Sequence, residues 1–206
     1  MFITFEGLDF CGKSTQVELL KKYFEEFGKK VQIIREPGGV KISEKIRKIL
    51  LDNENEEMFS ETELLLFSAS RAQLVREKII PFIKKGDVVI SDRFHDSSIA
   101  YQGFGRGIDT NFVIDLQKFA IGNAIPTLTF FIDIPTEEVL RRKENVTKEE
   151  LDRIEVSELN FYEKVRKGYK ILAEKEERFL TIDGLMSIEK IHEEIVKKIK
   201  AIKDNC

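Results

Sequence analysis

The stretch GLDFCGKS, residues 7–14, places two glycines, a lysine and a hydroxyl side chain at the spacing GxxxxGK[ST]. It lies between a strand-like run, FITFE, and a helix-like run, TQVELLKKYF. In such a loop the glycines let backbone N–H groups turn toward an anion, and the N-terminus of the following helix adds its dipole. Lys13 would supply a positive charge to the β- and γ-phosphates, and Ser14 a hydroxyl ligand for Mg²⁺.

The alternative reading is a structural strand-to-helix turn, but both flanking elements are where phosphate binding needs them. We therefore expect this loop to bind a nucleoside triphosphate with magnesium. The residues expected to bind the triphosphate are Gly7, Leu8, Asp9, Phe10, Cys11, Gly12, Lys13, Ser14 and Thr15.

Two further polar clusters follow strand-like runs, namely REPGG (residues 35–39) and DRFHDSSIAYQG (residues 92–103). In an open parallel sheet, ligands collect at the carboxyl ends of the strands. Asp92 ends an apolar run where a magnesium-binding acid is expected, and Arg93 beside it suits a phosphate. The alternatives are a structural ion pair for Asp92 and Arg93 and a plain turn for Pro-Gly-Gly.

The elements that must position these clusters alternate between short apolar runs and amphipathic stretches. Five runs are typical of buried strands: FITFE, VQIIR, VVISD, LTFFID and FLTID, at residues 2–6, 31–35, 88–92, 128–133 and 179–183. The first helix is expected to end near Gly28, and another to begin at Ser60, where SETE offers a capping box, and to run toward Pro81. This order predicts an α/β fold, a five-stranded parallel sheet with helices on both faces.

Size and charge limit the possible functions. The chain has 206 residues, which favours one domain, and a net charge of only −3, so no broad basic field indicates a nucleic-acid partner. No apolar run approaches the ~18 residues that a membrane helix needs, and no signal segment precedes the first strand. The two cysteines, Cys11 and Cys206, do not form a disulfide framework. We expect a cytoplasmic protein without a membrane partner.

Four stretches closely resemble the bacterial thymidylate kinases: FEGLDxxGKSTQ (residues 5–16), REPGG (35–39), DRFxDSSxAYQG (92–103) and LDRIE (151–155). The first is shared with many nucleotide kinases, but the other three together are specific to this family. The resemblance implies a P-loop NTPase fold over residues 1–206, phosphate transfer from ATP to dTMP, a short lid at about residues 141–156, and a homodimer.

The resemblance also assigns roles to single residues. Asp9 would lie near the acceptor sugar and magnesium, with Ser14 and Asp92 as the other metal-site residues. Phe67 would stack on thymine and Arg71 would reach the base edge; on pattern alone, Phe67 reads as core packing. The residues expected to bind dTMP are Asp9, Arg35, Phe67, Arg71, Arg93, Ser97, Ser98, Tyr101 and Gln102. An alternative for Ser97 and Ser98 is helix capping.

The quoted motifs do not by themselves identify the residue whose positive charge stabilises the transferring phosphate. Some relatives carry an arginine where this chain has Phe10, and the resemblance implies that the basic residue near the transferred phosphate can come from that loop position or from the lid. The segment RRKENVTKEELDR, residues 141–153, is almost wholly charged and is expected to be exposed and mobile. We predict Arg153, and next Arg141, as catalytic with Asp9, Lys13 and Arg93. Arg142, Lys143 and Lys148 are interpreted as a solvated face.

Two other functions remain open from the residues. One is a kinase of another nucleoside monophosphate or of a deoxynucleoside. The other is a P-loop GTPase-type switch, although the guanine-reading sequence NKxD is absent from the chain.

Overall fold

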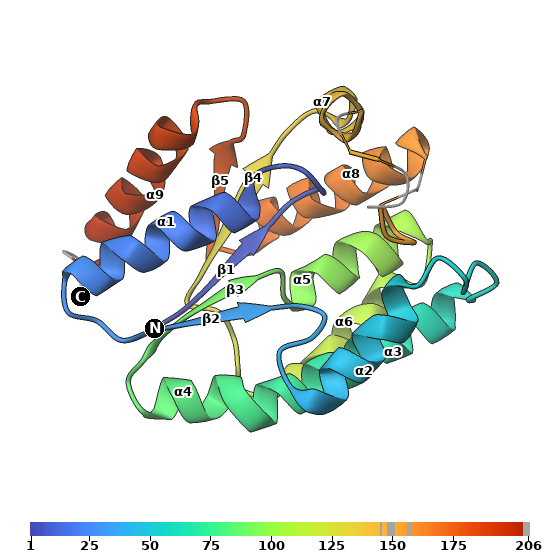
Figure 1. The fold of residues 1–206 in the computed structure, drawn as a ribbon, viewed down its shortest axis with the longest axis horizontal. Coiled ribbons are helices and arrows are strands. Elements are labelled where there is room, and N and C mark those ends of the chain that lie inside the picture. Colours follow the sequence, from blue (N-terminus) through green and yellow to red (C-terminus); the bar gives the residue numbers. More distant parts are fainter. Residues whose placement is uncertain (145, 148–150, 156–157, 204–206) are drawn as a thin grey trace.

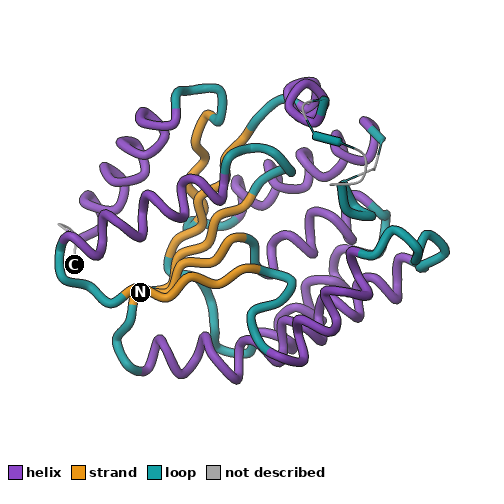
Figure 2. Tube along the Cα trace, in the orientation of Figure 1, coloured by secondary structure: helices purple, strands orange, loops and turns teal. Residues whose placement is uncertain are grey.

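The computed structural model describes residues 1–144, 146–147, 151–155 and 158–203, and the five predicted strands are present with the predicted bounds. They are β1 (Phe2–Glu6), β2 (Val31–Arg35), β3 (Val88–Asp92), β4 (Leu128–Asp133) and β5 (Phe179–Asp183). All pairs are parallel, in the order β2-β3-β1-β4-β5. The predicted α/β fold with a five-stranded parallel sheet is confirmed (Figure 2).

Apolar residues on both faces explain why these runs form central strands. Every residue of β1 is buried, because β3 and β4 flank it and helices cover both faces. Phe5 of β1 and Phe130 of β4 pack with ring centroids 5.4 Å apart. β1 lies between β3 and β4, with β2 beyond β3 on one side and β5 beyond β4 on the other. Its carboxyl end therefore lies where the strand order reverses, which is where such sheets bind ligands.

The helices flank this sheet on both sides. They are α1 (Lys13–Glu26), α2 (Lys41–Leu51), α3 (Ser60–Leu74), α4 (Ile80–Lys84), α5 (His95–Ser98), α6 (Thr110–Ile121), α7 (Thr136–Lys143), α8 (Leu159–Lys175) and α9 (Ile188–Lys203), with π-helical segments at Val75–Ile79 and Ile99–Gly105. In Figure 1, α1 and α9 lie together on one side of the strands, and α4, α5 and α8 lie on the other. No helix among the described residues is long and apolar enough to cross a membrane.

Two local expectations were wrong. Helix α3 does begin at Ser60, but no side chain caps it, and Glu63 of the expected capping box is buried in contacts described below. The segment before α8 is not uniformly exposed either, because Leu151, Arg153 and Ile154 are buried. Residues 145, 148–150, which include Lys148, and 156 of the expected lid lie outside the described residues, as does Cys206.

Candidate functional site

A cavity of about 530 Å³ opens at the carboxyl ends of β1, β2 and β3. Its lining combines the loop after β1, the loop after β2, the segment after β3 and residues of α3 and α7. The lining residues that the sequence predicted are Asp9, Phe10, Gly12, Lys13, Ser14, Thr15, Arg35, Phe67, Arg71, Asp92, Arg93, Ser97, Ser98, Tyr101 and Gln102. Residues far apart in the chain therefore meet at one site.

The loop after β1 has the conformation that its glycines predict. A Cβ on Gly7 would lie 2.5 Å from the Ile132 carbonyl oxygen, so no side chain fits there. Gly12, which precedes α1, has a φ of 94°, a left-handed conformation that glycine adopts without strain. Gly7, Leu8 and Cys11 are buried and do not line the cavity.

Lys13 is held inside this loop. Its Nζ donates to the carbonyl oxygens of Leu8 at 2.7 Å and Gly7 at 3.3 Å, and lies 3.5 Å from Cys11 Sγ. These are weak neutral acceptors for a buried ammonium, so an anion in the loop would compete for the same protons.

Ser14 and Asp92 meet across the cavity although they lie on different elements. The Ser14 hydroxyl donates to Asp92 Oδ2 at 2.6 Å. A hydroxyl and a carboxylate oxygen are hard ligands of the kind that Mg²⁺ takes, and this donor set fits the ion.

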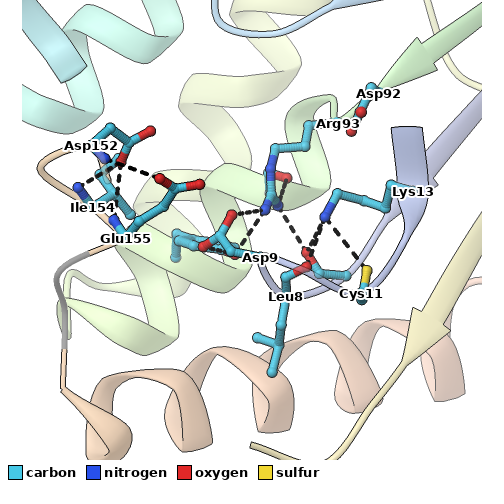
Figure 3. Close-up of polar contacts among 12 residues, drawn as sticks. Leu8, Asp9, Cys11, Lys13, Asp92, Arg93, Asp152, Ile154 and Glu155 are labelled. Atoms are coloured by element: carbon cyan, nitrogen blue, oxygen red, sulfur yellow. Dashed lines mark hydrogen bonds and ion pairs between the residues drawn. The ribbon is translucent and has the colours of Figure 1, made fainter. Parts of the chain in front are cut away.

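Asp9 pairs with Arg93 instead of joining Ser14 and Asp92. Its Oδ1 accepts from Arg93 Nη2, and its Oδ2 accepts from the hydroxyls of Tyr101 at 3.0 Å and Tyr162 at 3.3 Å. Figure 3 shows the Asp9 carboxylate directed at the Arg93 guanidinium. Burial alone would raise the pKa of Asp9, but the charges of Arg93 and Lys13 outweigh it and hold this pKa below its usual value.

The backbone at Arg93 is strained. Its φ of 69° lies in the left-handed region that residues other than glycine rarely adopt. The Ser91 hydroxyl donates to the Arg93 carbonyl at 2.6 Å, and the Arg93 N–H donates to Phe5 at 2.9 Å. These contacts hold the arginine in a conformation that turns its side chain into the cavity.

A second part of the cavity is built around Arg71. Its Nε donates to Glu36 Oε2 at 2.6 Å, its Nη1 to Ser98 at 2.8 Å and to Gln117 at 2.6 Å, and its Nη2 to the Phe94 carbonyl at 3.1 Å. A guanidinium has five N–H groups, so one remains for a ligand. Oε1 of Glu36 is buried and has no hydrogen-bond partner among the described residues. Two residues that line the cavity therefore hold, side by side, one N–H group and one carboxylate oxygen without a partner among the described residues.

Phe67 lies on α3 four residues before Arg71, and both line the cavity. Phe67 is half-buried and also packs against the core, so its position is compatible with both stacking and packing. Gln102 lines the cavity and donates to Glu63 Oε1 at 2.9 Å. Arg35 lines the cavity too, but its guanidinium donates to Glu44 at 3.3 Å.

The capping alternative for Ser97 and Ser98 is wrong, because α5 has no side-chain cap. The Ser97 hydroxyl donates to Glu6 at 2.6 Å, and that of Ser98 accepts from Arg71. Both hydroxyls instead belong to the polar networks that hold Arg93 and Arg71.

The expectation that Arg153 is a catalytic arginine disagrees with its position. Its side chain is 8% exposed and does not line the cavity. Nη2 donates to Glu63 Oε2 at 2.6 Å and Nε to the Leu50 carbonyl at 2.9 Å. Arg106 and Gln102 also donate to Glu63, so this carboxylate ties the LDRIE segment to α3 and to the segment after α5. Asp152, Ile154 and Glu155 of that segment line the cavity in its place.

The two neighbouring arginines of α7 are placed opposite to expectation. Arg141 has a 67% exposed side chain, pairs with Glu138 and does not line the cavity. Arg142, interpreted above as part of a solvated face, lines the cavity and donates to the Phe10 carbonyl at 2.9 Å and the Gly184 carbonyl at 3.3 Å. The interpretation of Arg142 was wrong because the packing of α7, not its composition, decides which arginine faces the loop.

Sequence reasoning also missed Glu6, Glu36, Glu63, Tyr162 and Tyr169, each of which contacts a predicted site residue. Glu6 and Glu36 stand inside quoted motifs, FEG and REPGG, and an acid in or beside a buried strand was a usable signal. The two tyrosines of α8 follow an apolar helical pattern and gave no such signal.

Comparisons with known proteins agree with this site. The family model described as Thymidylate kinase matches residues 5–195. A thymidylate kinase of Kosmotoga olearia is 52% identical over 199 residues, which are 96% of this chain and 94% of that protein. One from Fervidobacterium nodosum is 47% identical and covers 98% of this chain and 99% of its own length. The crystal structure of thymidylate kinase from Ehrlichia chaffeensis has a TM-score of 0.79 and 34% identity, covering 97% of this chain and 98% of that one.

Proposed function

The chain belongs to the thymidylate kinase family, and we propose from this premise that it transfers the γ-phosphate of ATP to dTMP, giving ADP and dTDP. The observation that carries the proposal is that Lys13 and Arg93 face one cavity from two different strand ends. One cation thus lies in a loop suited to the donor triphosphate, and the other lies where an acceptor phosphate can pair with it.

The acceptor oxygen of dTMP is already an anion, so the transfer needs no strong general base. Positioning and charge neutralisation are then the protein's main contributions. Arg93 would exchange its pairing with Asp9 for a phosphate oxygen, and Asp9 would stay close to the acceptor. Lys13 would exchange the carbonyls of Gly7 and Leu8 for phosphate oxygens.

Magnesium is the implied cofactor, and Ser14 and Asp92 are the residues that would hold it. When bound, the ion neutralises charge on the transferring phosphates. Asp9 was also predicted as a metal-site residue; its pairing with Arg93 instead favours a role on the acceptor side.

Recognition of the base is supported by the spare groups of Glu36 and Arg71. Thymine presents a C=O beside an N–H, so Arg71 can donate to the carbonyl and Glu36 Oε1 can accept from the N–H. The corresponding edge of cytosine has the opposite order of donor and acceptor. Phe67 would provide the stacking surface, since base–aromatic stacking does not depend on hydrogen bonding.

An acceptor panel tests this function. Purified protein with Mg-ATP should form ADP only when dTMP, or more weakly dUMP, is present, and chelating magnesium should abolish the reaction. Coupled measurement of ADP release reads the outcome. Equal turnover with AMP or CMP would favour a kinase of another nucleotide, and GTP hydrolysis without an acceptor would favour a GTPase-type switch.

The pair Arg142 and Arg141 offers a matched test of the donor side. Arg142→Ala should raise the KM for ATP about tenfold, because it removes a cation from the cavity wall and a tie to the Phe10 carbonyl. Arg141→Ala should change KM and kcat less than twofold, since an exposed ion pair contributes little. Steady-state kinetics at saturating dTMP measure both, and equal effects of the two variants would contradict the assignment.

A homodimer remains our proposal for the assembly. Ile42 and Ile49 are exposed seven residues apart on α2, as are Phe112 and Phe119 on α6, and helix α3 between them exposes Leu65. Exposed apolar residues at this spacing lie on one helix face, and such a face suits a second copy of the chain. Sedimentation of the purified protein measures its oligomeric state.

A cytoplasmic location likewise stays a prediction.

A further inference from the structure

Glu6, the last residue of β1, is a fully buried carboxylate to which the mechanism above gives no role. Oε1 accepts from the Phe94 N–H at 2.8 Å. Oε2 accepts from the hydroxyl of Ser97 at 2.6 Å and from that of Tyr169, on α8, at 2.9 Å. A buried carboxylate with three donors is costly to keep in the interior, so its partners need an explanation.

Both hydroxyls also contact Arg93. Its Nη1, whose shortest hydrogen bond is to the Gly7 carbonyl at 2.9 Å, also donates to Ser97 Oγ at 3.3 Å and to Tyr169 Oη at 3.4 Å. A hydroxyl carries one hydrogen and two lone pairs. When both hydroxyls direct their hydrogens at Glu6, only lone pairs are left toward the guanidinium, and both oxygens can accept from it.

We propose that Glu6 is a positioning residue that, through the hydroxyls of Ser97 and Tyr169, orients Arg93 toward the acceptor phosphate, and that a proton on Glu6 reverses this orientation. The inference rests on the proposed function, because it concerns the same arginine. Protonated Glu6 donates to one hydroxyl and so occupies one of its lone pairs. That hydroxyl then turns its own hydrogen toward the other hydroxyl, which lies 2.9 Å away, or toward the guanidinium. In both cases fewer lone pairs are left for Arg93, and its hold weakens.

The charges around Glu6 make this switch relevant near neutrality. Burial, and next the Asp96 carboxylate on α5, raise the pKa of Glu6 to about 7, although Ser97, Arg93 and Tyr169 oppose the increase. Arg178, before β5, also faces it but is held by Asp96 at 2.7 Å. Glu6 is then ionised above pH 7 and increasingly protonated below it, so the orienting contacts are lost as the pH falls.

The test compares Glu6→Gln with the unaltered protein. Glutamine can accept from Phe94 with its oxygen, and its NH₂ group then faces the two hydroxyls, which imitates the protonated acid at every pH. At pH 8 we expect kcat/KM for dTMP to fall about tenfold, mainly through a higher KM for dTMP, with the KM for ATP unchanged. Below pH 8, the unaltered protein should lose kcat/KM through two protonations, that of Glu6 and that of the dTMP phosphate, whose pKa is about 6. The variant should show only the second.

Tyr169→Phe carries the test independently of whether Glu6→Gln folds, since it removes one hydroxyl and keeps the ring. It should show a weaker pH dependence and a raised KM for dTMP. Glu18→Gln, on the exposed side of α1, is the matched control and should match the unaltered protein. A lower melting temperature with an unchanged pH profile in both test variants would overturn the inference and leave Glu6 a structural group. Absence of ADP formation with dTMP in the unaltered protein would instead defeat the proposed function.

Discussion

Replacing Arg93 with alanine is expected to lower kcat/KM for dTMP by about 10³, the scale on which arginines that stabilise phosphoryl transfer act. Arg93 lies in the cavity with a 17% exposed side chain, between Asp9 and the hydroxyls of Tyr101, Ser97 and Tyr169. Its removal deletes the cation nearest the expected acceptor phosphate. It also leaves Asp9 with one charge fewer to hold its pKa down.

Arg93→Lys should recover part of the loss, because lysine keeps the charge but not the planar fork of donors. Steady-state kinetics against dTMP, with the melting temperature recorded for each variant, separate a lost contact from a lost fold. Near-normal turnover of a folded Arg93→Ala protein would remove Arg93 from the proposed acceptor site.

Replacing Arg153 with alanine is expected to lower the free energy of unfolding by about 3 kcal/mol, near the low end of the cost of breaking a buried ion pair. The low end applies because Glu63 would still accept from Arg106 and Gln102. The LDRIE segment would also lose the contact of Arg153 with the Leu50 carbonyl.

Chemical denaturation measures this change, and Arg141→Ala is the matched control, since its exposed pair with Glu138 should contribute little to stability. In the remaining folded Arg153→Ala protein, kcat should fall far less than in Arg93→Ala. A loss of about 10³ in kcat with unchanged stability would restore the catalytic role that the sequence suggested for Arg153.

Local signals explain why so much of the architecture could be predicted. Each strand is a short, largely apolar run, and any parallel sheet buries such a run between neighbouring strands and the helices that cover its faces. The bounds of the strand therefore depend little on the rest of the chain. The loop of Gly7 and Gly12 is equally local, because only glycine tolerates its backbone angles and close contacts. The position of Asp92 at the end of β3 then placed it at the same edge of the sheet as Ser14.

The arginines show where local signals end. Arg141 and Arg142 are neighbours of the same type on one helix, and no property of the segment distinguishes them. The acids beside Arg153 suggested that they position it, yet its partner is Glu63, 90 residues earlier in the chain. The pattern at Ser60 assigned Glu63 to a capping box, so the sequence did not identify it as the partner of Arg153.

By itself, the sequence determined the parallel sheet, the phosphate-binding loop and the family, because each depends on residue types at fixed short spacings. The tertiary structure alone decided which charges face the cavity: Arg142 rather than Arg141, Arg93 paired with Asp9, and Arg153 buried against Glu63. The physical reason is that a long charged side chain can point in many directions from one backbone position. Its direction is set by the partner that packing brings within hydrogen-bond distance, and that partner is distant in the sequence.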